Sequence, residues 1–463
     1  MQLDLNELFA DCSAMEQLAQ QLAAWQASPP AAAEFVHLER RLHELVQAVE
    51  CALLASQAAR YDAVAPEVVV QGQRYRRVLR SPQTYQSLAG PLHLERHLYR
   101  PEEGAGKTIC PLELRLGLLA GLWTPGAAEA ASLAVSEMPP EEAAALLPKV
   151  GGMQPSRASL ERLPKLIGAE WETSREEWEA TLQTAAIVPP DAVTMAVSLD
   201  GVQVPMRSPG AAKAGAKGKA RTQGPVGYKE ASCGTISFYN TTGVRLGTWR
   251  CARPPEARKK ELKAHLAATA EAFLAQRPDL HLVLLSDGAP DHWTFLERWA
   301  GERPHTSLAD FWHAAEYLKG ALDDYYGERS PKASSSFAAY KTLLQEDAQG
   351  ADKVIQTLRY RAGRCRGEQR KRIRQALRYF RKQRSRMGYA AARGAGWPIG
   401  SGVTEAACKT LVTQRCKQSG MRWSAPGLEA ILMLRSWWQS DQWEPAWELL
   451  HAARTQVVME VWD

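Results

Sequence analysis

The chain has 463 residues, a formal net charge of +6 and 8 cysteines. This length allows two to four domains, each able to bury its own core without disulfides or structural metals. The cysteines are scattered, with no C-x-x-C pair and no Cys/His cluster at zinc-ligand spacing, which predicts reduced thiols. We find no N-terminal signal and no apolar stretch of roughly 20 residues, so we expect a soluble cytoplasmic protein with no membrane partner.

The first 190 residues fall into three predicted regions. Residues 1–65 have apolar residues at helical spacing, which predicts amphipathic helices that pair with another subunit or pack on their own domain. Residues 66–110 alternate β-branched, aromatic and basic residues between Gly and Pro turns, which predicts a small basic antiparallel sheet.

Residues 111–190 predict several short helices, and their end is typical of a helix-turn-helix. Gly151 and Gly152 would form its turn, and Ser156 or Ser159 would cap the next helix. The predicted DNA contacts near this cap are Ser156, Arg157, Ser159 and Arg162. Short helix pairs are also frequent in cores that never bind DNA, and both interpretations stay open.

Strands and helices alternate over residues 191–310. Apolar strands are predicted up to Asp200 and, in HLVLLS, up to Asp287; between them lie a hairpin around Thr242-Gly243 and a helix at about 256–276. A last strand spans about 305–310. This order of three strands, helix, strand, helix and strand predicts a mixed α/β sheet of RNase H-like type. The Gly- and Lys-rich stretch between 203 and 228 predicts a mobile basic loop.

A helical insertion over residues 311–395 interrupts this pattern and carries most of the basic charge. From Lys353 to Arg386 there are 14 Lys or Arg and one acid, Glu368. Such a run is either a solvated helix face or a surface that follows a phosphate backbone, and its interleaved aromatic residues favour the second. The predicted DNA contacts here are Arg370, Lys371, Arg374 and Arg378.

Residues 396–440 return to the core, and 441–463 are expected to form a C-terminal tail. The stretch 400–402, Gly-Ser-Gly, leads into a helix that carries Glu405 in its first turns. Basic residues that follow on this helix or at its end are Lys409, Arg415, Lys417 and Arg422, which would contact phosphates near a DNA terminus or stay ordinary surface cations.

Three carboxylates form the candidate active site. Asp200 and Asp287 each follow an apolar strand and precede a glycine, so neighbouring strands would bring them together at one sheet edge, although Asp-Gly is also an ordinary turn signal. Glu405 would lean over the same edge. Carboxylates that converge on two divalent cations perform phosphodiester chemistry, so Asp200, Asp287 and Glu405 are predicted to hold two Mg²⁺ or Mn²⁺ ions.

The segments SLDG (198–201), LLSDGAPDHW (284–293), ADFWHAAEYL (309–318) and WPIGSGVTEAACKTLVTQRCKQSGMRW (397–423) resemble bacterial insertion-sequence transposases of the ISKra type. The resemblance covers residues 67 to 440 and implies an RNase H-like core of DDE type interrupted by a helical insertion. It also implies recognition of the inverted-repeat ends of a mobile element. We further expect target DNA as a partner, with both DNAs double-stranded, a homo-oligomer with a dimer favoured, and a location in the bacterial nucleoid.

The resemblance makes Asp200 the first acid, Asp287 the second and Glu405 the third, with Asp291 the alternative for the second. His313, three residues after Asp310, matches a D-x-x-H pair near the core of related transposases; it has either a catalytic role or the role of a buried helix histidine. Family members carry zinc-binding cysteine pairs in the small N-terminal sheet, where this chain keeps only Cys110.

Two other functions remain open at this point. An RNase H-like nuclease or resolvase would share the metal chemistry but cut without joining, because its nucleophile is water rather than a DNA 3′ hydroxyl. An inactive, domesticated DNA-binding protein would keep the basic surface; the retention of all three acids argues against it.

Overall fold

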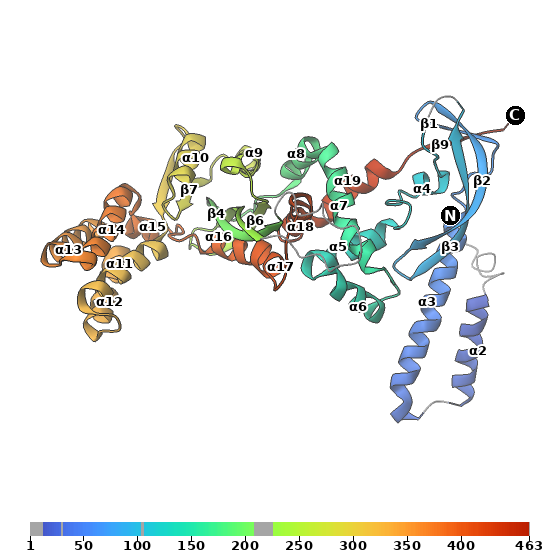
Figure 1. The fold of residues 1–463 in the computed structure, drawn as a ribbon, viewed down its shortest axis with the longest axis horizontal. Coiled ribbons are helices and arrows are strands. Elements are labelled where there is room, and N and C mark those ends of the chain that lie inside the picture. Colours follow the sequence, from blue (N-terminus) through green and yellow to red (C-terminus); the bar gives the residue numbers. More distant parts are fainter. Residues whose placement is uncertain (1–12, 29–30, 103–105, 208–225, 463) are drawn as a thin grey trace, which may run out of the picture. The chain divides into compact units, whose positions relative to one another are not determined.

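The computed structural model describes residues 13–28, 31–102, 106–207 and 226–462 (Figure 1). The chain forms two compact units: residues 1–173 with 444–463, and residues 174–443. The central part of the predicted Gly- and Lys-rich loop, residues 208–225, lies outside the described residues. Within them, no helix has the length and apolar character that crossing a membrane requires.

The first unit contains a four-stranded antiparallel sheet in the order β3-β2-β1-β9. Its strands are β1 (Glu67–Val70), β2 (Gln73–Gln86), β3 (Pro91–Pro101) and β9 (Val458–Val461). Gln71 and Gly72 join β1 to β2 with positive φ values of 48° and 81°, as a tight hairpin turn requires. The predicted small sheet is therefore present, and the end of the expected C-terminal tail is its fourth strand.

The first unit also contains several helices. They are α2 (Ser13–Ala27), α3 (Phe35–Ala59), α4 (Pro111–Arg115), α5 (Pro125–Glu137), α6 (Pro140–Val150), α7 (Arg157–Thr173) and α19 (Trp443–Arg454), whose first residue belongs to the second unit. A short 3-10 helix, η1 (Ala32–Glu34), precedes α3. Figure 1 shows α2 and α3 side by side as a hairpin. Of these helices, α3 and α4 contact the sheet. The half-buried Cys51, Ala55 and Ala58 of α3 pack against the apolar cluster of the sheet, and the buried residues of this helix are Leu45 and Val49.

The second unit is built on a mixed five-stranded sheet in the order β6-β5-β4-β7-β8. Its strands are β4 (Thr194–Arg207), β5 (Val226–Tyr239), β6 (Arg245–Arg253), β7 (His281–Ser286) and β8 (His305–Ala309). Strands β4, β5 and β6 are antiparallel, and β7 and β8 are parallel to β4. The order of elements matches the sequence prediction, with one correction: β4 does not stop at Asp200 but continues to Arg207.

Helices α8 (Arg175–Ala185), η2 (Ala257–Lys259), α9 (Lys260–Gln276) and α10 (Pro290–Ala300) accompany this sheet. Leu262, Leu266 and Phe273 of α9 and Trp293 and Leu296 of α10 pack in one apolar core with the strands. The near-continuous apolar runs of β4 and β7 are typical of strands that are covered on both faces.

The predicted helical insertion forms a group of its own (Figure 1). Its members are α11 (Phe311–Tyr326), α12 (Pro331–Glu346), α13 (Gly350–Arg364), α14 (Gly367–Gln383), η3 (Arg384–Arg386) and α15 (Tyr389–Gly394). Their shared core contains Phe311, Leu318, Leu358, Ile373 and Phe380.

The chain then returns through α16 (Gly402–Ala407), a π-helical turn η4 (Cys408–Thr413), α17 (Gln414–Cys416) and α18 (Ala425–Trp438). Leu411, Val412 and Leu428 pack with Val204 and Cys233 of the sheet. Thr404 and Thr235 share a hydrogen bond of 2.7 Å, which ties α16 to β5.

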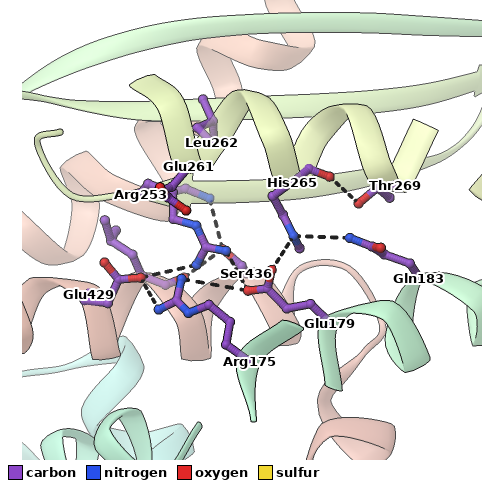
Figure 2. Close-up of polar contacts among 12 residues, drawn as sticks. Arg175, Glu179, Gln183, Arg253, Glu261, Leu262, His265, Thr269, Glu429 and Ser436 are labelled. Carbon is purple, nitrogen blue, oxygen red and sulfur yellow. Dashed lines mark hydrogen bonds and ion pairs between the residues drawn. The ribbon is translucent and has the colours of Figure 1, made fainter. Parts of the chain in front are cut away.

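A buried ionic network joins α8, β6, α9 and α18 (Figure 2). Glu179 contacts Arg253 at 2.6 Å and His265 at 2.7 Å, and Glu429 contacts Arg253 at 3.2 Å and Arg175 at 2.8 Å. Burial favours the neutral form of Glu179, but the hydrogen bond and charge of His265, together with Arg253, lower its pKa to about 2. The three helices and the one strand are thus joined by buried charges of opposite sign.

Candidate active site

Asp200 and Asp287 lie level with each other on adjacent parallel strands. The parallel register pairs Ser198 of β4 with Leu285 of β7, and two further residues along each chain reach Asp200 and Asp287. Each strand pair of a parallel sheet is about 4.8 Å apart, so side chains at one level are neighbours. The sequence prediction that these two acids meet at one sheet edge is consistent with this register.

Asp310 occupies the same level on the third parallel strand, because Ser286 of β7 pairs with Ala309 of β8 and the next residues are Asp287 and Asp310. Its carboxylate is fully buried. It accepts hydrogen bonds from the backbone N–H of His313 at 2.5 Å, from the backbone N–H of Ser401, and from the Ser401 hydroxyl at 2.7 Å. Asp310 therefore caps α11 and holds the loop before α16.

Glu405 enters the site from α16. Cys408, one helical turn further on and on the same helix face, places its Sγ 4.0 Å from Oδ2 of Asp200. Burial raises the pKa of Glu405, and the charges of Asp310 and Asp200 raise it further. The charges of both aspartates therefore act on the Glu405 carboxyl group, while its side chain remains solvent-accessible.

Asp200, inside β4, and Asp287, directly after β7, have opposite electrostatic environments. Burial raises the pKa of Asp200, and the nearby charge of Asp287 adds to the increase. Burial acts in the same direction on Asp287, but hydrogen bonding by His292 and by the Ala289 backbone outweighs it and lowers the pKa of Asp287 below its usual range. Asp287 is therefore the acid that the surrounding protein holds most firmly as a carboxylate.

Asp291, the alternative second acid, has a different setting. It lies in the first turn of α10, is exposed, and forms an ion pair of 2.6 Å with Lys263. This ion pair lowers the pKa of Asp291. The strand register places Asp287, and not Asp291, beside Asp200.

His313 lies at the edge of this site on the first turns of α11. Asp310 is the N-cap of α11 and accepts from the His313 backbone N–H. This contact between the N-cap and the third residue of the helix accounts for the D-x-x-H spacing. The His313 ring packs edge-on against Tyr317 and Tyr379, with centroids 5.2 and 5.8 Å away. The charge of His313 lowers the pKa of Glu405, and the His313 Nδ1 lies 3.7 Å from Oε2 of Glu316.

The donor set of this site fits a hard divalent cation, since Asp200, Asp287 and Glu405 supply only oxygen ligands. In the described part of the chain, no three His, Cys, Asp or Glu side chains are placed closely enough to hold a metal ion. Asp200 and Asp287 lie at one level of the sheet. A bound cation would have to draw their side chains and that of Glu405 closer together.

The basic run of the insertion divides into two sets. A groove of about 740 Å³ is formed by α13 and α14. The cations that line it are Arg359, Arg370, Lys371, Arg374, Arg378 and Arg381, and its other described lining residues are Ala362, Gly363, Gly367 and Leu377. No acidic residue is among them, so the groove is an anion-attracting surface. It contains all four residues predicted as DNA contacts in this region.

Other cations of this run, on α13, α14 and η3, form ion pairs with acidic residues. Arg372 pairs with Asp324 at 2.7 Å, Arg386 with Glu297 at 2.6 Å, and Lys353 and Arg384 bind Asp347 and Asp352. On α14 itself, Tyr379 donates to the backbone carbonyl of Asp287 at 3.3 Å, and Gln383 to that of Gly288 at 3.2 Å. The helix that carries the groove therefore also contacts the turn of the second acid.

Other predicted DNA contacts have specific surroundings. Ser156 caps α7 by accepting from the Ser159 N–H at 3.1 Å, and Arg157 pairs with Glu161 and Glu141 at 2.9 and 3.2 Å. Arg162 is exposed and its Nε donates to the Ala158 carbonyl. Gly152 packs so closely on Ala89 that a Cβ there would lie 1.8 Å from the Ala89 carbonyl oxygen.

The cations after Glu405 differ among themselves. Lys409 and Lys417 are exposed and Arg422 is half-buried. Arg415 is 2% exposed, with its guanidinium 5.2 Å from the centre of the Trp423 ring, so its side chain is not presented at the surface where the sequence prediction has it. Lys409 is at an exposed position of η4 and Arg415 at a buried position of α17, so only the first of these two cations reaches solvent.

Comparison with known proteins gives little further information. No protein-family profile matches the chain, and no curated protein does. Among solved structures, the chain is similar to the Drosophila P element transposase in its strand transfer complex, with 11% sequence identity and a TM-score of 0.25 over 72% of this chain and 82% of that chain. This likeness is too slight to bear on function, and the ISKra-type resemblance remains a prediction from the motifs.

Proposed function

We propose that this protein is a DDE transposase with an RNase H-like core, which cleaves DNA at the inverted-repeat ends of an insertion sequence of ISKra type and joins those ends to target DNA. The observation that carries the proposal is the parallel register that sets Asp200 of β4 level with Asp287, directly after β7, together with the effect of the Asp200 charge on the pKa of Glu405 in α16. The strand order, in which an antiparallel trio is extended by two parallel strands, supports an RNase H-like core.

In this proposal the three acids hold two Mg²⁺ or Mn²⁺ ions, which activate the nucleophile and stabilise the leaving oxygen. Asp287, kept ionised by its hydrogen bonds, is the permanent ligand, whereas Asp200 and Glu405 have raised pKa values that a bound cation would reverse. His313 lies beside Glu405 and would contact the scissile phosphate.

The proposed nucleic-acid partner is double-stranded DNA. The groove cations Arg370, Arg374 and Arg378 would follow its phosphate backbone, and α7 of the first unit would contact base edges. A homodimer, favoured by the amphipathic helices α2 and α3, and a place in the bacterial nucleoid stay predictions of the sequence.

The proposal is tested with a supercoiled donor plasmid that carries this gene with its natural flanking DNA. Purified protein with Mg²⁺ or Mn²⁺ is expected to release 3′ hydroxyl ends at the element boundary and to join them to a second plasmid, as sequencing of the junctions would record. Asp200→Asn, Asp287→Asn and Glu405→Gln are each expected to abolish both products while duplex binding persists.

Asp291→Asn is the matched control, because it removes a charge four residues from Asp287 that is already paired with Lys263. It should retain activity. Cleavage without joining would support a nuclease or resolvase instead, and an active Asp287→Asn protein would contradict the assignment of the second acid.

A further inference from the structure

The backbone is strained at the end of η2, directly before α9 begins. Arg258 and Lys259 have φ values of 57° and 54°, so two consecutive non-glycine residues adopt the left-handed conformation. L-residues adopt this conformation rarely because of steric strain, and such strain persists where the surrounding structure requires it. The two side chains have different surroundings: Arg258 is exposed, whereas the Lys259 side chain is only 14% exposed.

Lys259 is directed into the acid site. Its Nζ lies 2.6 Å from Oε1 of Glu230 on β5 and 2.8 Å from Nε2 of His292 on α10. Glu230 in turn packs against Gly201, where an added Cβ would lie 2.2 Å from Oε1. The strained turn therefore places an ammonium group between the β4–β5 pair and the first turn of α10.

The contact with Lys259 determines the tautomer of His292. An ammonium group has only donors, so Nε2 of this imidazole must accept, and the ring proton of the neutral form must be on Nδ1. His292 is 5% exposed, and its Nδ1 faces the Ser286 hydroxyl at 3.5 Å and Oδ1 of Asp287 at 3.6 Å. The proton on Nδ1 is therefore on the side of the Ser286 hydroxyl, which donates to Oδ1 of Asp287, and of Oδ1 itself.

Within the ranges that the structure describes, the contacts of the Asp287 carboxylate converge on one oxygen. Oδ1 accepts from the Ala289 N–H at 3.0 Å and from the Ser286 hydroxyl at 3.2 Å, in addition to facing His292. Among the described residues, Oδ2 receives no hydrogen bond. One oxygen is thus bound by the protein and the other remains available to a ligand.

We propose that Lys259 is a positioning residue of the active site: by donating to His292 it fixes the imidazole tautomer that holds Oδ1 of Asp287, and so keeps Oδ2 available for a cation. The inference rests on the proposed function for the meaning of that cation, but the relay from Lys259 to Asp287 stands on the contacts alone. Orientation of a ligand by a hydrogen-bonded second residue typically contributes 10- to 100-fold to metal affinity.

Two measurements on the full chain test the relay. Histidine ring ¹⁵N shifts, with the His292 signals assigned from His292→Gln, are expected to show the Nδ1–H tautomer in the wild type. Lys259→Met should shift His292 towards Nε2–H, because the group that forced Nε2 to accept is gone. Mn²⁺ binding, followed by electron paramagnetic resonance, should weaken about tenfold or more in the same variant.

The strained turn supplies a matched pair of controls. Arg258→Gly and Lys259→Gly remove the same kind of backbone strain, but only the second removes the ammonium. Arg258→Gly should keep the wild-type Mn²⁺ affinity and melt at the same or a higher temperature, whereas Lys259→Gly should lose Mn²⁺ affinity without a lower melting temperature. Lys259→Arg, which keeps a cationic donor, should restore part of the affinity lost in Lys259→Met.

A wild-type His292 tautomer in Lys259→Met would overturn the relay, and so would unchanged Mn²⁺ affinity in a protein that binds Mn²⁺. If the wild-type protein neither binds Mn²⁺ nor cleaves DNA, the proposed function fails. The tautomer measurement still decides in that case whether Lys259 controls His292.

Discussion

Asp310 and Ser401 are 91 positions apart in the sequence, and both the backbone N–H and the hydroxyl of Ser401 donate to the same carboxylate oxygen of Asp310. Beside them, the Phe311 N–H donates to the Ile399 carbonyl at 2.9 Å. The helical insertion therefore leaves and re-enters the core through two residues bound to each other. This clamp sets the start of α16 and, with it, the place of Glu405.

Asp310→Asn should destabilise the second unit and loosen the loop before α16. The carboxylate accepts on both oxygens, so an amide must turn its NH₂ group towards a backbone N–H, and one buried donor is left unsatisfied at a cost of about 1 to 3 kcal/mol. Urea titration would measure the loss, and hydrogen exchange should speed up in peptides that cover residues 397–407.

Asp323→Asn is the matched control on the same helix, because Asp323 forms an i,i+4 ion pair with the exposed Lys319. Its effect should stay below about 1 kcal/mol. Equal effects of the two substitutions would refute a special role for the clamp.

The groove cations should determine the salt dependence of DNA binding. Changing Arg370, Arg374 and Arg378 to Gln removes three cations that face the groove and have no acidic partner among the described residues. Each lost phosphate contact changes the slope of log K against log salt by about 0.9, so the slope should flatten by about 2 to 3. Fluorescence anisotropy with a labelled duplex at several salt concentrations measures it.

A triple variant with the same change in net charge tests whether position or total charge matters. Lys353, Arg372 and Arg384 are each paired with an aspartate. Their replacement by Gln should flatten the slope by less than about 1. If both triple variants give the same slope, the basic run acts as a diffuse solvated face.

Glu179 should make the second unit sensitive to acid. Its pKa is lowered to about 2 in the folded protein, against about 4.3 for an unperturbed glutamate. A lowered folded-state pKa contributes stability that is complete above about pH 5 and is lost as the pH falls towards 2. Glu179→Gln should therefore cost about 3 kcal/mol at pH 7, and its difference from the wild type should narrow in acid.

Urea unfolding at a series of pH values measures both quantities. Glu177→Gln, an exposed position two residues away on α8, is the control and should differ little from the wild type at any pH. A Glu179→Gln deficit that is constant from pH 7 to pH 3 would contradict the role assigned to its carboxylate.

Recognition of the element ends should belong to the first unit. A fragment ending near residue 190 would lack β9 and leave the edge of β1 unpaired, so the fragment to test is 1–173 joined by a flexible linker to 444–463. We expect this protein to prefer inverted-repeat DNA over scrambled DNA, because α7 presents Ser159 and Arg162 near its N-terminus.

Residues 174–443 alone should bind both DNAs equally, since groove cations contact phosphates and not bases. Competition binding with both duplexes compares the two proteins. Discrimination by residues 174–443 alone would move the specificity to the insertion.

The sequence by itself determined the order of strands and helices in the second unit and the positions of Asp200 and Asp287 after apolar runs, whereas their common level follows from the strand register. Apolar runs that end at Asp287, an Asn-Thr-Thr-Gly hairpin turn, and a Gly-Ser-Gly entry before Glu405 are local signals, and periodicity and turn chemistry encode them within a few residues. Asp310 has the same signal, an acid directly after a strand, and its level beside Asp287 follows from the parallel register.

Only the tertiary structure decided which partners those residues have. That β9 completes the N-terminal sheet, that Asp310 binds Ser401, and that Lys259 reaches His292 depend on segments between 33 and about 390 residues apart. The basic run is a second example of what local sequence does not encode. Arg372 of α14 is paired with Asp324, whereas Arg370 and Arg374 of the same helix line the groove, although all three are arginines. Local patterns do not encode such pairings, because their free energy arises only when the whole chain has closed the loops between them.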